Sequence, residues 1–114
     1  MNIVVAGGGR VGFHLASLLC AENHNVTVIE SDPERSEEID YSLDASVLLG
    51  STTSIRTLSQ AGIEAADLFV AATGNDDINM LAAATAKALG VPQTVARADD
   101  PIYAESRSRY ESLL

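Results

Sequence analysis

The chain of 114 residues carries a formal net charge of −9 at pH 7, which argues against nucleic acid or an anionic membrane surface as its main partner. The length suits one domain, so we expect residues 1–114 to form a single domain of a longer protein. Cys20 is the only cysteine, which excludes an internal disulfide and zinc clusters and is typical of a reducing cytosol. No apolar run approaches the roughly 20 residues that cross a bilayer, so we expect no membrane insertion.

Short apolar strands alternate with helical patterns along the chain. The expected strands are residues 3–6, 25–30, 45–49, 67–72 and 93–97. The expected helices are residues 10–21, 34–41, one capped by Ser54 or Thr53 that runs through residue 59 or 60, residues 76 to about 89, and one from Asp100-Pro101 to the chain end. Asp32 before Pro33, and Asn75, are also residues of the type that cap helices, and Gly62 ends the third helix.

This alternation predicts an α/β fold, a Rossmann-like doubly wound parallel sheet with helices on both faces. The expected strand order is 3-2-1-4-5. In this topology a ligand lies over the carboxyl ends of the strands, in the crevice between strands 1 and 4.

Apolar spacing predicts which face each long helix turns to the sheet. In the first helix the expected sheet-facing residues are Val11, Leu15, Leu18 and Leu19. In the fourth helix the expected core stripe is Ile78, Leu81, Ala82, Thr85, Ala88 and Leu89. Its other faces then carry Ala83, Ala84 and Ala86, which would admit a helix of a second subunit or simply reflect high helix propensity.

The first strand runs directly into a glycine-rich turn. Residues 7–12 read G-x-G-x-x-G, with a strand before the motif and a helix after it, as a pyrophosphate site requires. Gly7 permits the tight turn, Gly9 lets the backbone approach the phosphates, and Gly12 lets the helix pack on the strand. The N–H groups of the new helix favour an anion, and Arg10 would reach over the phosphates or point into solvent. Val11 belongs to the same motif.

An acid closes the second strand. Glu30 follows Gly12 at the spacing expected for a carboxylate that accepts hydrogen bonds from the ribose hydroxyls. It would repel a 2′-phosphate, so NAD(H) or an adenine nucleotide is favoured over NADP(H). Ser31 lies beside it. The alternative is an ordinary solvated acid at a strand end.

Three further strand ends should face the crevice. The loop of Gly50, Ser51 and Thr52 would flank the adenine or simply cap the next helix. The segment Thr73-Gly74-Asn75, with Asn79 one turn on, would contact the second phosphate or ribose, cap its helix, or do both. Arg97 would pair with a phosphate, or with Asp99 or Asp100.

No catalytic constellation is evident. His14 and His24 have no partnering acid at a telling spacing, and Cys20 lies among apolar residues of the first helix, which is typical of inert packing. We therefore expect no metal site and no enzyme activity. The alternative is the cofactor-binding part of an NAD-dependent oxidoreductase that lacks its catalytic domain.

With these residues in view, the chain resembles the TrkA N-terminal domain, also called the KTN or RCK domain, of potassium-transport proteins. The first motif alone fits any Rossmann protein, and the segment from Thr73 to Met80, together with the loop at Gly50, makes the match specific. The resemblance covers nearly the whole chain and rests on residues 3–12, 28–30 with Asp32, 50–53, 58–62, 65–67, 71–80 and 95–97.

The resemblance implies a regulatory domain that binds NAD(H), ATP, ADP or AMP and gates potassium flow through a membrane-embedded channel or transporter. Such domains lie on the cytoplasmic face of the cell membrane, held there by their partner, and form homodimers or larger rings. By this resemblance the nucleotide would be held by Gly7, Gly9, Arg10, Gly12, Glu30, Thr52, Thr73, Asn75 and Arg97.

Overall fold

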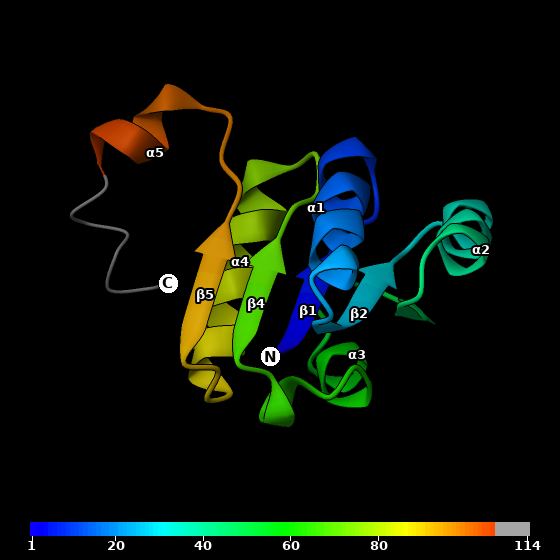
Figure 1. Ribbon diagram of the computed structural model, residues 1–114. Helices are drawn as coiled ribbons and strands as arrows, with labels where there is room; N and C mark the ends of the chain where they lie inside the picture. Colours follow the sequence, from blue (N-terminus) through cyan, green and yellow to red (C-terminus); the bar gives the residue numbers. More distant parts are fainter. Residues whose placement is uncertain (107–114) are drawn as a thin grey trace.

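The computed structural model describes residues 1–106, and these form one parallel sheet with helices on both faces (Figure 1). The strands are β1 (Asn2–Ala6), β2 (Asn25–Glu30), β3 (Ser46–Leu49), β4 (Leu68–Ala71) and β5 (Gln93–Ala96). The helices are α1 (Arg10–Ala21), α2 (Pro33–Ser42), α3 (Ile55–Gln60), the 3₁₀ turn η1 (Ile63–Ala65), α4 (Asp76–Ala88) and α5 (Pro101–Glu105). The expected elements are confirmed, with ends that differ by one or two residues except in α5.

The five strands follow the order β3-β2-β1-β4-β5, and all four pairings are parallel. The predicted order is confirmed. β2 and β3 lie on one side of β1, whereas β4 and β5 lie on the other. The two halves of the sheet meet where β1 pairs with β4, with Val5 opposite Val70 and Ala6 opposite Ala71. Because the carboxyl ends of these central strands diverge into loops on opposite sides, this point of a doubly wound sheet is where a ligand site forms.

Each face of the sheet has its own core. Ile3, Val5 and Val28 pack with α1 and α2 on one face. Val4 and Phe69 pack on the other face with α3 and α4, and Figure 1 shows α4 behind β4 and β5. The central strand β1 is therefore apolar on both sides, as expected for a covered parallel sheet.

The sequence prediction for the sheet-facing side of α1 is wrong for two of its residues. Val11 is 43% exposed and Leu18 is 51% exposed, whereas Gly12 and Ala16 are buried. Leu19 does pack partly against the core. A Cβ on Gly12 would collide with the carbonyl oxygen of Gly7, so the helix lies too close to the sheet for bulky side chains to fit between them.

The same correction applies to α4. Ile78 is 39% exposed and Leu81 is 58% exposed, so neither belongs to the core stripe predicted for them. Ala83 and Ala86, expected on the faces turned away from the core, are fully buried against the sheet. In α4, as in α1, small residues lie where the helix comes closest to the sheet.

A side chain caps the N-terminus of each of the helices α2, α3 and α4. Asp32 accepts a hydrogen bond from the Glu34 N–H at 3.1 Å and precedes Pro33, and Asn75 accepts one from the Ile78 N–H at 3.0 Å. Ser54 caps α3. These predicted caps are confirmed.

The last helix is shorter than expected within the described part of the chain. α5 ends at Glu105, and the predicted continuation to the chain end falls on residues 107–114, outside the described residues. In residues 1–106 no helix is both long enough and apolar enough to cross a membrane.

Candidate functional site

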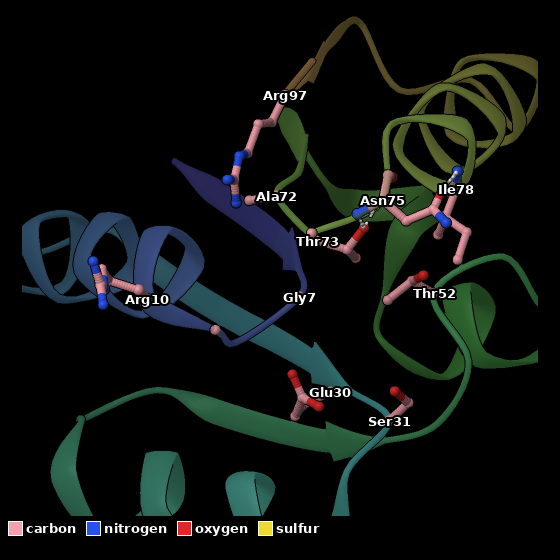
Figure 2. A pocket seen from close by; sticks show the side chains of 12 residues that line it. Gly7, Arg10, Glu30, Ser31, Thr52, Ala72, Thr73, Asn75, Ile78 and Arg97 are labelled. Carbon is pink, nitrogen blue, oxygen red and sulfur yellow. Dashed lines mark hydrogen bonds between the residues drawn. The ribbon is translucent and has the colours of Figure 1, made fainter. Parts of the chain in front are cut away.

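A cleft opens at the carboxyl ends of β1, β2 and β4, with a volume of about 510 Å³. Figure 2 shows the side chains that surround it, and we call this space the nucleotide cleft after the ligand expected from the sequence. It is lined by Gly7, Gly9, Arg10, Glu30, Ser31, Thr52, Ala72, Thr73, Gly74, Asn75, Ile78 and Arg97. Its size lies in the range of small-molecule sites.

The glycine turn brings backbone, and no side chain, to one wall of the cleft. Gly7 has φ 102°, and a Cβ there would lie 2.9 Å from the Thr73 nitrogen, so only glycine allows this turn against β4. A Cβ on Gly9 would meet nothing within 4 Å. The turn therefore leaves free space beside Gly9, one of the residues that line the cleft.

The N-terminus of α1 is the exception among the α-helices of residues 1–106. The other four have a capping side chain, whereas Gly9, the N-cap of α1, has none, and the first turn of α1 holds no acidic residue. The first N–H groups of a helix need acceptors. A phosphate at this position would accept those hydrogen bonds and meet the positive end of the helix dipole.

Glu30 is fixed in place by two backbone groups. Its Oε1 accepts a hydrogen bond from the Gly8 N–H at 2.8 Å, and its Oε2 accepts one from the Asp32 N–H at 2.8 Å. A carboxylate oxygen can accept more than one hydrogen bond. Glu30 therefore remains able to accept from two hydroxyls of a ligand while the protein holds its orientation (Figure 2).

Across the cleft, the Thr73–Asn75 turn is built by its own side chains. The Thr73 hydroxyl lies 2.6 Å from the Asn79 Oδ1 and accepts from the Asn75 N–H at 3.2 Å. The turn leads into α4, whose first residues include Ile78 at the cleft. This wall of the cleft therefore presents both polar side chains and the apolar side chain of Ile78.

Asn79 lies outside the cleft lining. It is fully buried, and its amide donates to the carbonyls of Thr73 and Arg97 at 3.0 and 2.9 Å. Its Oδ1 accepts from the Thr73 N–H at 2.9 Å and from the Thr73 hydroxyl. With two donors and two acceptor positions filled, Asn79 joins the carboxyl ends of β4 and β5.

Arg97 lines the cleft and is paired at the same time. Its guanidinium lies 3.1 Å from the Asp99 carboxylate, one of the two partners expected from the sequence, whereas Asp100 caps α5. The Asp76 carboxylate accepts from the N–H groups of Asp99 and Asp100. These two hydrogen bonds, with a smaller contribution from Arg97, hold the pKa of Asp76 below its ordinary value.

Arg10 lies at the rim. Its side chain is exposed, and in Figure 2 its guanidinium lies beside α1, on the far side of the turn from Thr52 and Thr73. The orientation is the solvent-facing one of the two expected from the sequence.

Ten of the fourteen predicted site residues line the cleft. The four outside the lining are Val11, Gly12, Ser51 and Asn79. Sequence reasoning missed Ala72 and Ile78. Ile78 could have been found from the sequence. It is the third residue after Asn75, the N-cap of α4, and residues three apart lie on the same side of a helix.

The remaining titratable side chains considered from the sequence lie elsewhere. Cys20 packs partly against the core on the sheet face that α1 and α2 cover, and burial raises the pKa of its thiol. This is in keeping with the predicted inert packing. His24 contacts the N-terminal amine at 3.2 Å and Glu22 at 3.7 Å. Neither residue lines the nucleotide cleft.

Comparison with known proteins identifies relatives of the whole described fold. A Trk system potassium uptake protein TrkA homolog of Methanothermobacter thermautotrophicus is 42% identical over 106 residues. That alignment covers 93% of this chain and 49% of the relative, so the chain spans about half the length of that protein.

Two solved structures share the fold at lower identity. The Kef CTD of Shewanella denitrificans, in AMP-bound form, is 24% identical with a TM-score of 0.79, and the match covers 98% of this chain and 69% of that one. The GsuK channel bound to NAD is 20% identical with a TM-score of 0.77, and the match covers 96% of this chain and 20% of that one.

The family model of the TrkA-N domain matches residues 3–111. The match spans nearly the whole chain and confirms the resemblance drawn from the sequence motifs. This chain belongs to the TrkA-N domain family.

Proposed function

We propose that the nucleotide cleft binds an adenine nucleotide and that its occupancy regulates potassium transport. The proposal rests on the observation that the Glu30 carboxylate and the uncapped N-terminus of α1 line the same cleft. The first suits a ribose diol, and the second suits a pyrophosphate. NAD(H) is the ligand proposed first, with ATP, ADP and AMP as alternatives.

The far wall supports a ligand that extends beyond one phosphate. Thr73, Gly74 and Asn75 line the cleft opposite the glycine turn, and they would contact a second phosphate or ribose. AMP and NAD occur in the two solved structures named above. A dinucleotide would span both walls, whereas AMP would occupy the Glu30 side.

Regulation follows from a ligand that contacts both walls. If the walls approach each other differently in two states of the assembly, a ligand that binds one state better shifts the population toward it. The shift is limited by the difference in affinity between the states. The role proposed is therefore that of a sensor without catalysis.

The partner proposed is a membrane-embedded potassium channel or transporter, as the names of the relatives suggest. The domain would act at the cytoplasmic face, as a homodimer or a larger ring. The outward-facing Leu81 of α4, and not the buried Ala83 and Ala86, would then be available for subunit contacts.

The test is rubidium flux through the reconstituted full-length protein and its membrane partner, with and without NAD⁺, NADH or ADP. We expect at least one nucleotide to change the flux, and Glu30→Gln to remove that response while Glu37→Gln keeps it. Flux that ignores every nucleotide would contradict the proposal. Sustained NADH oxidation with a small substrate would instead support the oxidoreductase alternative.

A further inference from the structure

The middle glycine of the turn, Gly8, is held from two sides by residues at and after the end of β2. Its N–H donates to the Glu30 carboxylate at 2.8 Å, and its carbonyl accepts from the Arg35 Nε at 2.6 Å. Gly8 is buried, and a Cβ on it would collide with the Cδ1 of Ile39. The turn is thus packed closely against α2.

Arg35 is itself held in position. Its guanidinium carbon lies 5.0 Å from the centre of the Phe13 ring on α1, and its Nη1 lies 2.8 Å from the Glu38 carboxylate. The stacked, planar guanidinium is pre-organised to donate in one direction. Arg35 therefore connects α2, α1 and the glycine turn.

The hydrogen bond to Gly8 has a consequence for the next residue. The Gly8 carbonyl and the Gly9 N–H belong to one peptide plane, and residues 1–106 contain no cis peptide bond. In a trans peptide these two groups point in opposite directions. Because Arg35 holds the carbonyl, the N–H of Gly9 points away from Arg35, and Gly9 is the N-cap of α1 and one of the residues that line the cleft.

We propose that Arg35 is a positioning residue for the phosphate subsite, an inference that rests on the proposed function. Glycine adopts either sign of φ at little cost, so the Gly8–Gly9 peptide could otherwise rotate and turn a carbonyl oxygen toward the phosphates. Arg35 excludes that orientation. Arg35 does not contact the ligand itself. Its effect is on the binding of the phosphates and not on the binding of the nucleoside.

The experiment compares ADP with adenosine by two-dimensional ¹⁵N NMR titration of the 114-residue chain. For the wild type we expect ADP to bind more tightly than adenosine. In Arg35→Met the ADP affinity falls about fivefold to tenfold, the loss expected when a group must be ordered on binding, and the adenosine affinity stays unchanged. Arg35→Lys, which keeps a donor and a charge, recovers part of the loss.

Glu38→Gln is the matched control, because it removes the ion pair of Arg35 and leaves the hydrogen bond to Gly8. We expect it to keep the wild-type ratio of the two affinities. An unchanged ratio in both Arg35 variants, or equal losses for ADP and adenosine, would overturn the inference. A wild-type chain that binds neither compound would overturn the proposed function itself, a result distinct from both.

Discussion

The carboxylate of Glu30 accepts a hydrogen bond from the N–H of Gly8 at 2.8 Å, so the end of β2 and the turn after β1 hold each other. The same carboxylate accepts from the Asp32 N–H, where α2 is about to begin. One side chain thus fixes the two loops that a bound nucleotide would contact. If Glu30 binds the nucleotide as proposed, binding and stability are coupled at this residue.

We expect Glu30→Gln to weaken the binding of NAD⁺ and ADP about tenfold or more. The amide keeps the shape, but its NH₂ group would face a backbone N–H and cannot accept from a ribose hydroxyl. The free energy of unfolding should also fall by about 1–3 kcal/mol, since one of the two backbone N–H groups bonded to Glu30 loses its acceptor. Glu37→Gln on the exposed side of α2 is the control. Unchanged affinity in Glu30→Gln would show that the ribose assignment is wrong.

Substitution of Gly7 should cost more stability than substitution of Gly90. Both have φ 102°, but a Cβ on Gly90 meets nothing within 4 Å, whereas one on Gly7 lies 2.9 Å from Thr73. Gly90→Ala then reports the backbone strain alone, about 1–3 kcal/mol. We expect Gly7→Ala to exceed it in urea denaturation. Equal losses for the two variants would mean that the turn has room to relax.

Asn79→Leu should lower the free energy of unfolding by about 3 kcal/mol, because several buried backbone groups lose their partners at once. Thr85→Ala, on the same helix with a hydroxyl bonded to the Leu81 carbonyl, is the milder comparison. Urea unfolding of both variants provides the measurement. A loss in Asn79→Leu no larger than that in Thr85→Ala would contradict the role given to Asn79.

The Asp76 carboxyl should make the stability of the domain depend on acid pH. Its pKa lies below the ordinary 3.8 in the folded chain, so the unfolded state binds protons first as the pH falls. The stabilisation is therefore present above about pH 4 and is lost as the pH falls through the folded pKa. Asp76→Asn should flatten this part of the profile in urea unfolding between roughly pH 2 and 6. Profiles of equal slope would contradict the prediction.

The sheet and the glycine turn could be predicted because their signals are local. The G-x-G-x-x-G spacing of residues 7–12 indicates a tight turn between a strand and a helix, and alternating strand and helix patterns set the order of a parallel sheet. Glu30 was found by its spacing from Gly12. Its hydrogen bond to Gly8 was not, because that contact depends on how closely α2 and the turn approach each other.

The helix faces were mispredicted for a physical reason. Apolar spacing favours bulky residues such as Leu18 and Leu81 as the core side, yet α1 and α4 approach the sheet through Gly12, Ala16 and Ala83. Close packing of a helix on a strand needs small residues, and a hydrophobicity pattern does not measure distance. Arg35, on an acidic surface helix, gave no local sign of its contact with the turn.

The most direct test of the nucleotide cleft is titration calorimetry of the 114-residue chain with NAD⁺, NADH, NADP⁺, ATP, ADP and AMP. We predict micromolar binding of at least one of the five ligands with a free ribose diol, and much weaker binding of NADP⁺, whose 2′-phosphate would face Glu30. The absence of binding by all six, or NADP⁺ as the tightest ligand, would contradict the assignment of Glu30 and the glycine turn to the nucleotide.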